Sequence, residues 1–132
     1  MQLLVSYPYL QLYLHKGESV ALEAQWTGMP GSVLLRQATL ECVTLAREHG
    51  VTGWIADDRQ LGPVSARDLE WIATYVLPLL IKWGVRRFAR LEGVAPLTQE
   101  RVGPVQDRAQ QQLAFELRSF TAPAEARAWA AG

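Results

Sequence analysis

The fold is decided by the stretch WIADDRQLGPVSARDLEW, which runs from Trp54 to Trp71. Its first residues, WIA, are apolar and predict a short strand, with Asp57 and Asp58 at the carboxyl end of that strand. The pair Gly62-Pro63 predicts a turn, because glycine and proline favour the backbone angles that turns require. The stretch therefore predicts a buried strand that is followed by a turn.

A helix is predicted directly after this turn. Ser65 and Asp68 have the spacing of a capping box, although Glu or Gln is more usual at the second position. The helix is expected to run to Gly84, and Pro78 predicts a kink there or just before it. The expected apolar face comprises Leu69, Ile72, Tyr75, Val76 and Leu79.

The residues before this unit predict three strands and a helix. Leu10, Leu12 and Leu14 alternate with more polar residues, and SVALEAQWTG repeats the alternation, so the first 28 residues predict an antiparallel meander. The segment 32–50 predicts a helix that Ser32 caps and Gly50 ends. The expected apolar stripe of this helix comprises Leu34, Ala38, Val43, Leu45 and Ala46.

The residues after this unit predict a further alternation of strands and helices. VRRFARLEG predicts a strand, residues 97–112 a weak helix, LAFELRSF a strand and APAEARAWAAG a terminal helix with Pro123 in its first turn. Alternating strands and helices place strands in parallel. We therefore predict one α/β domain over residues 1–132, with a mixed β-sheet of about six strands, an N-terminal antiparallel meander followed by β-α repeats, and helices packed on the sheet.

Composition narrows the possible functions. Lys plus Arg and Asp plus Glu balance at 13 each, so a nucleic-acid partner is not expected. The longest apolar run, WIATYVLPLLIKW, is shorter than the about 20 residues that span a bilayer, so no membrane insertion is expected. Cys42, His15 and His49 lack the spacing of metal ligands, and the lone cysteine fits a reducing cytoplasm. We expect no metal, no cofactor and no catalytic residue.

The candidate binding site lies at the end of the predicted strand. Ligands of sheets with parallel strands favour the crevice beyond the strands' carboxyl ends, and the next helix offers free N–H groups there. The alternative is purely structural: Ser65 and Asp68 cap, Asp57 and Arg59 brace the loop, and the tryptophans fill the core. The candidate residues are Trp54, Asp57, Asp58, Arg59, Ser65, Asp68 and Trp71.

One charged residue is unexpected within a predicted strand. Arg90 shares a face with Phe88 in RRFARLEG, although strands covered on both faces are mostly apolar. Either Arg90 is exposed near the strand's end, or it needs a carboxylate partner, for which Asp57 on a neighbouring strand is suitable.

The pattern W-x-x-D-x-R-x-L-G-x-V-x-x-x-D-x-x-W between Trp54 and Trp71 resembles a group of small bacterial proteins with a STAS-like, or SpoIIAA-like, fold. The predicted order of elements matches that group along nearly the whole chain. In the anti-sigma factor antagonists among STAS domains, a serine at the start of the helix after a central strand is phosphorylated by a partner kinase. Ser65 occupies a similar place, but VSARD stands where those antagonists have D-S-[SA]-G.

Two functions are compatible with these features. The absence of a catalytic constellation favours a non-enzymatic regulatory or protein-binding module that uses the loop Asp57–Asp68 to bind a protein partner or a second copy of the chain. The alternative is a small apolar-ligand binder or weak enzyme, with a pocket lined by Trp54, Trp71 and Tyr75 and the polar residues Asp57, Arg59 and Ser65.

Overall fold

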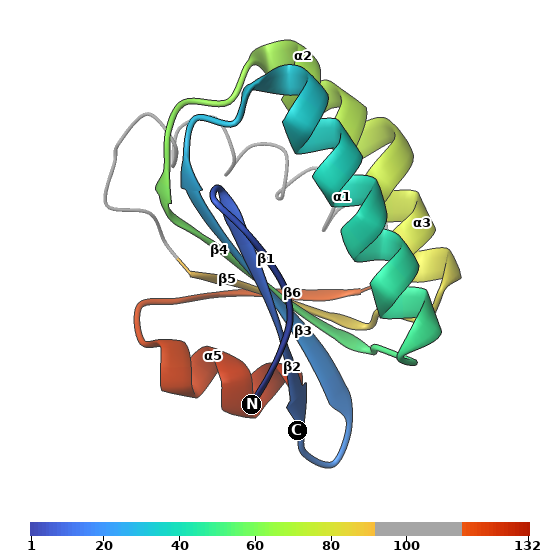
Figure 1. Ribbon diagram of the computed structural model, residues 1–132. Coiled ribbons are helices and arrows are strands. Elements are labelled where there is room, and N and C mark those ends of the chain that lie inside the picture. The colour runs from blue at the N-terminus through green and yellow to red at the C-terminus, as the bar shows by residue number, and fades with distance from the viewer. Residues whose placement is uncertain (92–114) are drawn as a thin grey trace.

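Six strands of the described residues form one mixed sheet, in the same order as in the chain (Figure 1). The computed structural model describes residues 1–91 and 115–132. The first three strands pair antiparallel, and the third to the sixth pair parallel, which confirms the predicted fold class. The strands are β1 (Gln2–Tyr7), β2 (Leu10–Lys16), β3 (Val20–Gly28), β4 (Gly53–Leu61), β5 (Arg87–Leu91) and β6 (Glu116–Phe120).

Helices cover both faces of this sheet. On one face lie α1 (Gly31–Glu48), α2 (Ala66–Trp71), the π-helical turn η1 (Ile72–Val76) and α3 (Leu77–Lys82). On the other face lies α5 (Pro123–Ala130), which packs on β3, β4 and β5 (Figure 1). The weak helix predicted for residues 97–112 lies outside the described residues. No helix in the described parts of the chain is long and apolar enough to cross a membrane.

The first helix differs from the prediction in its cap and its buried stripe. The cap is Pro30 rather than Ser32, which lies inside the first turn, while Gly50 ends the helix region with a φ of +63°, as expected. The helix buries Leu35, Ala38, Thr39, Cys42, Val43 and Ala46 against the sheet. Leu34, predicted to be buried, is 41% exposed because the buried stripe is centred one residue further along the helix.

The second helix changes geometry directly before Pro78, where the sequence predicts an irregularity. Proline has no N–H to donate to the carbonyl four residues earlier, and the preceding turn, η1, has π geometry. The extra residue of a π turn changes which side chains face the sheet. Tyr75, which lies within this turn and was predicted to be buried, is 62% exposed, whereas Leu77 and Leu80 after the turn are buried.

The strand β4 is longer than predicted, and this decides where its two aspartates point. It continues to Leu61, so Asp57 and Asp58 lie within the strand rather than at its end. Gln25 pairs with Asp57 and Thr27 with Gln60, which leaves one extra residue in β4 as a bulge. Because side chains alternate along a strand, Asp57 faces α5 and Asp58 faces the helices α1 to α3.

Candidate functional site

The structure places the seven candidate residues in three separate places instead of one crevice. One group lies along α2, from its N-cap to its last residue, one on the sheet face that α5 covers, and one between the sheet and α1 to α3. The first group is Ser65, Asp68 and Trp71, the second is Asp57 and Arg59, and the third is Trp54 and Asp58.

At the start of α2, the polar side chains bind one another. The Asp68 backbone N–H donates to Ser65 Oγ at 3.1 Å, and this hydroxyl donates to Asp68 Oδ2 at 3.0 Å, which confirms the predicted cap. Asp68 Oδ1 accepts from Ser32 Oγ at 2.5 Å and from Arg36 Nε at 2.9 Å. Burial alone raises the pKa of Asp68, but the hydrogen bonds from Ser32, Arg36 and Ser65 outweigh it and hold the pKa below 3.8.

The predicted crevice exists beside this cluster, but its polar residues are already engaged. It is lined by the segment from Met29 to Ser32 and by Ser65 and Asp68, among others. Trp71 is half-buried outside this crevice, with the guanidinium carbon of Arg36 at 5.0 Å from its ring centre. The geometry at this place therefore matches the structural alternative, in which the residues cap and brace.

On the sheet face that α5 covers, Asp57 pairs with Arg59 as predicted. Arg59 Nε and Nη2 each donate to one Asp57 oxygen at 2.9 Å, and this bidentate geometry fixes both side chains. The suggested pairing of Asp57 with Arg90 is wrong. The two side chains project from opposite faces of the sheet, because Arg90 pairs in register with Ala56, one residue before Asp57.

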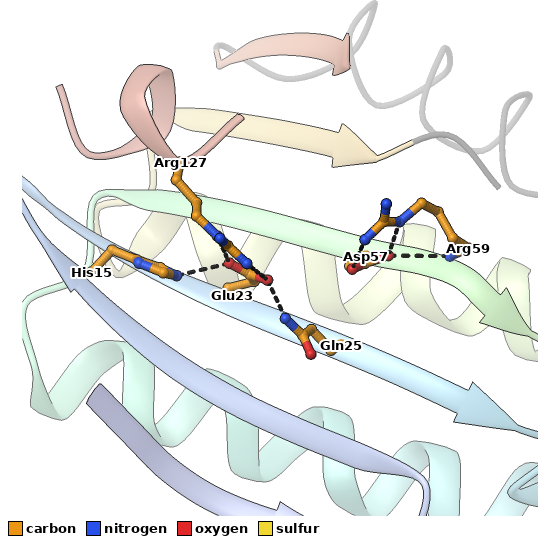
Figure 2. A network of polar contacts seen from close by, with 6 residues as sticks. All are labelled: His15, Glu23, Gln25, Asp57, Arg59 and Arg127. Atoms are coloured by element: carbon orange, nitrogen blue, oxygen red, sulfur yellow. Dashed lines mark hydrogen bonds and ion pairs between the residues drawn. The ribbon is translucent and has the colours of Figure 1, made fainter. Parts of the chain in front are cut away.

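Beside this pair lies a buried carboxylate that the sequence analysis missed (Figure 2). Glu23 on β3 is fully buried, and its Oε1 lies 2.7 Å from both His15 Nε2 and Arg127 Nε. Its Oε2 accepts from Arg127 Nη2 at 3.1 Å and from Gln25. Burial alone raises the pKa of Glu23, but the donors Arg127, Gln25 and His15 together bring it below 4.5.

A signal for this cluster was present in the sequence. Glu23 lies in a strand between the apolar residues Leu22 and Ala24. A carboxylate buried in such a strand requires hydrogen-bonding partners. Arg127 is a basic residue in the otherwise alanine-rich terminal helix. Because α5 lies over β3, Arg127 can reach Glu23 and link the end of the chain to the centre of the sheet.

The third place is an apolar pocket between the sheet and α1 to α3. Its volume is about 120 Å³. Trp54 and Phe88 line it from the sheet, and Cys42 and Leu80 line it from the helices. Asp58 is the one charged side chain among the described residues that line it. Burial raises the pKa of Cys42 to about 12, so this thiol stays neutral at ordinary pH.

Asp58 and Arg90 are both buried beside this pocket. Asp58 is 5% exposed, and its Oδ1 has no hydrogen-bond partner among the described residues. Burial raises the pKa of Asp58 to about 6, although the charge of Arg90 acts in the opposite direction. Arg90 is 7% exposed, so of the two alternatives for this residue the exposed one is wrong. Its Nε and Nη2 likewise find no partner in residues 1–91 and 115–132.

The pocket differs from the one expected from the sequence. Trp54 lines it, but Asp57 and Arg59 face α5, and Ser65, Trp71 and Tyr75 lie outside it. The alternation along β4 explains the first difference, since Asp58 points where Asp57 was expected to point. Tyr75 lies within the π turn and is exposed. The described residues contain no group of three or more His, Cys, Asp or Glu side chains that could hold a metal ion.

Comparisons with known proteins identify a fold. No protein-family model matches the sequence, and no curated protein matches it. A solved structure does: an uncharacterized protein of the DUF3478 family with a SpoIIAA-like fold from Shewanella loihica. The TM-score is 0.58, with 17% identity, and the match covers 96% of this chain and 98% of that chain. The molecule is thus an α/β protein with a SpoIIAA-like fold, as the sequence resemblance predicts.

Proposed function

We propose that this chain is a binding module that takes a small, largely apolar molecule into the pocket between the sheet and α1 to α3. The observation that supports this proposal is a buried acid, Asp58, which lines an otherwise largely apolar pocket. Small-molecule sites are typically apolar concavities with a few polar groups that orient the ligand.

The size of the pocket suggests the size of the ligand. At about 120 Å³ it is somewhat smaller than an engineered apolar cavity of about 150 Å³ that stays dry and binds benzene. A ligand that fills the pocket is therefore about the size of one ring or a short branched chain. A larger ligand would need part of its body outside the pocket.

The indole N–H signals of the tryptophans provide a direct test. The chain has five tryptophans, of which Trp26 and Trp54 line the pocket. Titration with toluene, followed by two-dimensional ¹⁵N–¹H NMR, is expected to shift these two signals. The signals of Trp83 and Trp129, which do not line the pocket, serve as an internal reference.

A variant that fills the pocket supplies the control. Ala56 lines the pocket and is only partly buried, so Ala56→Leu is expected to fill space that toluene would occupy. The variant should keep the wild-type circular dichroism spectrum and lose the toluene-dependent shifts. Equal shifts at all five indoles, or shifts that persist in the filled variant, would contradict the proposal.

The regulatory or protein-binding role expected from the sequence stays a second candidate. It is supported by Met29, Val33 and Leu40, which are 74%, 69% and 45% exposed. Val33 and Leu40 are seven residues apart and therefore lie on the same side of α1. If a second copy binds there, sedimentation of the wild type should report a dimer, and Val33→Glu with Leu40→Glu should yield a monomer. A wild type that is monomeric at high concentration argues against the homodimer.

Phosphorylation of Ser65 stays a prediction as well. A phosphate on Ser65 Oγ would meet the N–H groups at the start of α2, but also the carboxylate of Asp68, to which the hydroxyl now donates. Mass spectrometry of the chain from its native cells tests this prediction. Consistent absence of the modified peptide would count against it.

A further inference from the structure

We propose that the pocket selects an uncharged apolar molecule that carries one hydroxyl group, and that the carboxylate of Asp58 receives this hydroxyl as a hydrogen-bond donor. The inference rests on the proposed function and adds to it the chemical class of the ligand and the residue that recognises it. The carboxylate oxygen Oδ1 of Asp58 is buried and has no donor among the residues that the structure describes.

Among the described residues, no hydrogen-bond donor reaches Oδ1 of Asp58. An ionised carboxylate only accepts hydrogen bonds, so an unsatisfied oxygen requires a donor. The helices that line the pocket contribute apolar side chains together with Thr39 and Cys42. The hydroxyl of Thr39 already donates to the Leu35 carbonyl within α1, at 2.6 Å. A donor on the ligand would supply what these elements do not.

The charges near Asp58 favour a neutral ligand over a charged one. Arg90 on β5 acts on Asp58 as a positive charge, and Asp57, the adjacent acid on β4, acts as a negative charge. An amine would bring a second cation close to Arg90, whose Nε and Nη2 lack partners in the described chain. A carboxylate would face the charge of Asp58 itself. Asp58 and Arg90 already offset each other's charge, so a charged ligand would leave a net charge buried, which is costly, whereas a hydroxyl adds a donor without a charge.

A series of ligands that differ in one group tests this selectivity. Toluene, benzyl alcohol, benzylamine and benzoate share one ring and differ in the attached group. Their dissociation constants are measured by the NMR shifts of the indoles of Trp26 and Trp54 at about pH 8, where the Asp58 carboxyl, with a pKa of about 6, is ionised. Benzyl alcohol is expected to bind about tenfold more tightly than toluene, because a hydrogen bond to a charged group strengthens binding by at least that factor.

Two substitutions of neighbouring acids separate recognition from general effects of charge. Asp58→Leu removes the acceptor and should make benzyl alcohol bind no better than toluene. Asp57→Asn removes a charge one residue away on the opposite face and should preserve the wild-type preference. At about pH 5 the carboxyl of Asp58 is protonated, and the preference for the alcohol in the wild type should shrink.

The outcomes distinguish failure of this inference from failure of the proposed function. If toluene and benzyl alcohol bind the wild type equally, or if Asp58→Leu keeps the preference, the assigned role of Asp58 is wrong while the pocket remains a binding site. Tightest binding of benzylamine or benzoate would overturn the assignment of a neutral ligand. Absence of binding by all four compounds would overturn both proposals.

Discussion

Two buried acids on opposite faces of one sheet have contrasting surroundings. Glu23 faces α5 and is surrounded by donors from His15, Gln25 and Arg127. Asp58 faces α1 to α3 in an apolar pocket, and its Oδ1 finds no donor among the described residues. A carboxylate with all its hydrogen bonds satisfied joins elements of the fold, whereas one that lacks a donor is available to a ligand.

The pKa shifts of the two acids have opposite signs, so the two acids act oppositely on stability. The pKa of Glu23 is lowered, so its contribution is fully present above about pH 4.5 and is lost as the pH falls through its folded pKa. The pKa of Asp58 is raised, so the folded state binds a proton more tightly there than the unfolded chain does. Asp58 therefore lowers stability as the pH rises from about 4 to about 6, and the loss persists above that range.

The largest effect is expected when Glu23 loses its charged partner. Arg127→Met leaves a fully buried carboxylate without its guanidinium and should lower the free energy of unfolding by about 3 kcal/mol, measured by urea denaturation. Glu23→Gln added to that variant should recover about half of the loss, because the uncompensated charge disappears. The exposed Arg67→Met serves as the matched control and should change stability by less than about 0.5 kcal/mol. A single Arg127 variant as stable as the control would show that Glu23 does not depend on this ion pair.

The close packing of α5 on the sheet predicts the next largest effect. A Cβ atom added to Gly53 would lie 2.0 Å from the carbonyl oxygen of Ala130, which is backbone and cannot rotate away. Gly53→Ala should therefore lower the free energy of unfolding by about 2 to 3 kcal/mol. Gly50→Ala, where nothing lies within 4 Å of the added atom but φ is +63°, measures the backbone cost alone and should lose about 1 kcal/mol. Equal losses in the two variants would contradict the proposed clash with α5.

Replacing the acid on the other face should stabilise the protein. A rise in pKa from 3.8 to about 6 corresponds to about 3 kcal/mol as an upper bound, so Asp58→Asn should raise the free energy of unfolding by about 1 to 2 kcal/mol at neutral pH. Urea denaturation between about pH 4 and pH 7 should also show a smaller loss of stability with rising pH than the wild type shows. If the variant is less stable than the wild type at neutral pH, Asp58 and Arg90 form a stabilising pair.

Much of this architecture could be predicted because its signals are local. The alternation of leucines in β2 and the Ser65–Asp68 cap each depend on residues a few positions apart. The pairing of Asp57 with Arg59, two residues along one strand, is also local. These features are confirmed because strand alternation and capping operate within a single element.

The remaining features depend on details that short patterns do not specify. A bulge and a longer β4 determine that Asp58, not Asp57, lines the pocket. Tyr75 lies in a π turn that the sequence pattern did not predict, and it is exposed. Arg127 lies 104 residues from Glu23, so their pairing depends on where α5 docks. The fold could therefore be predicted from the sequence. The candidate site residues, in contrast, were expected together in one site, although strand alternation and helix geometry place them apart.

Asp68 is an intermediate case between the buried acids Glu23 and Asp58. Its capping cluster gives the smallest change in the free energy of unfolding that we predict. It is buried like Asp58, yet it accepts hydrogen bonds from Ser32, Arg36 and Ser65. Ser65→Ala removes one of these donors and the cap of α2, and it should lower the free energy of unfolding by about 1 kcal/mol in thermal denaturation at neutral pH. Ser65→Asn can still cap the helix and should lose less. Because two donors to Asp68 remain, the loss should stay well below that of Arg127→Met. A comparable loss would mean that the capping cluster, rather than the Glu23 ion pair, is the main polar contribution to stability.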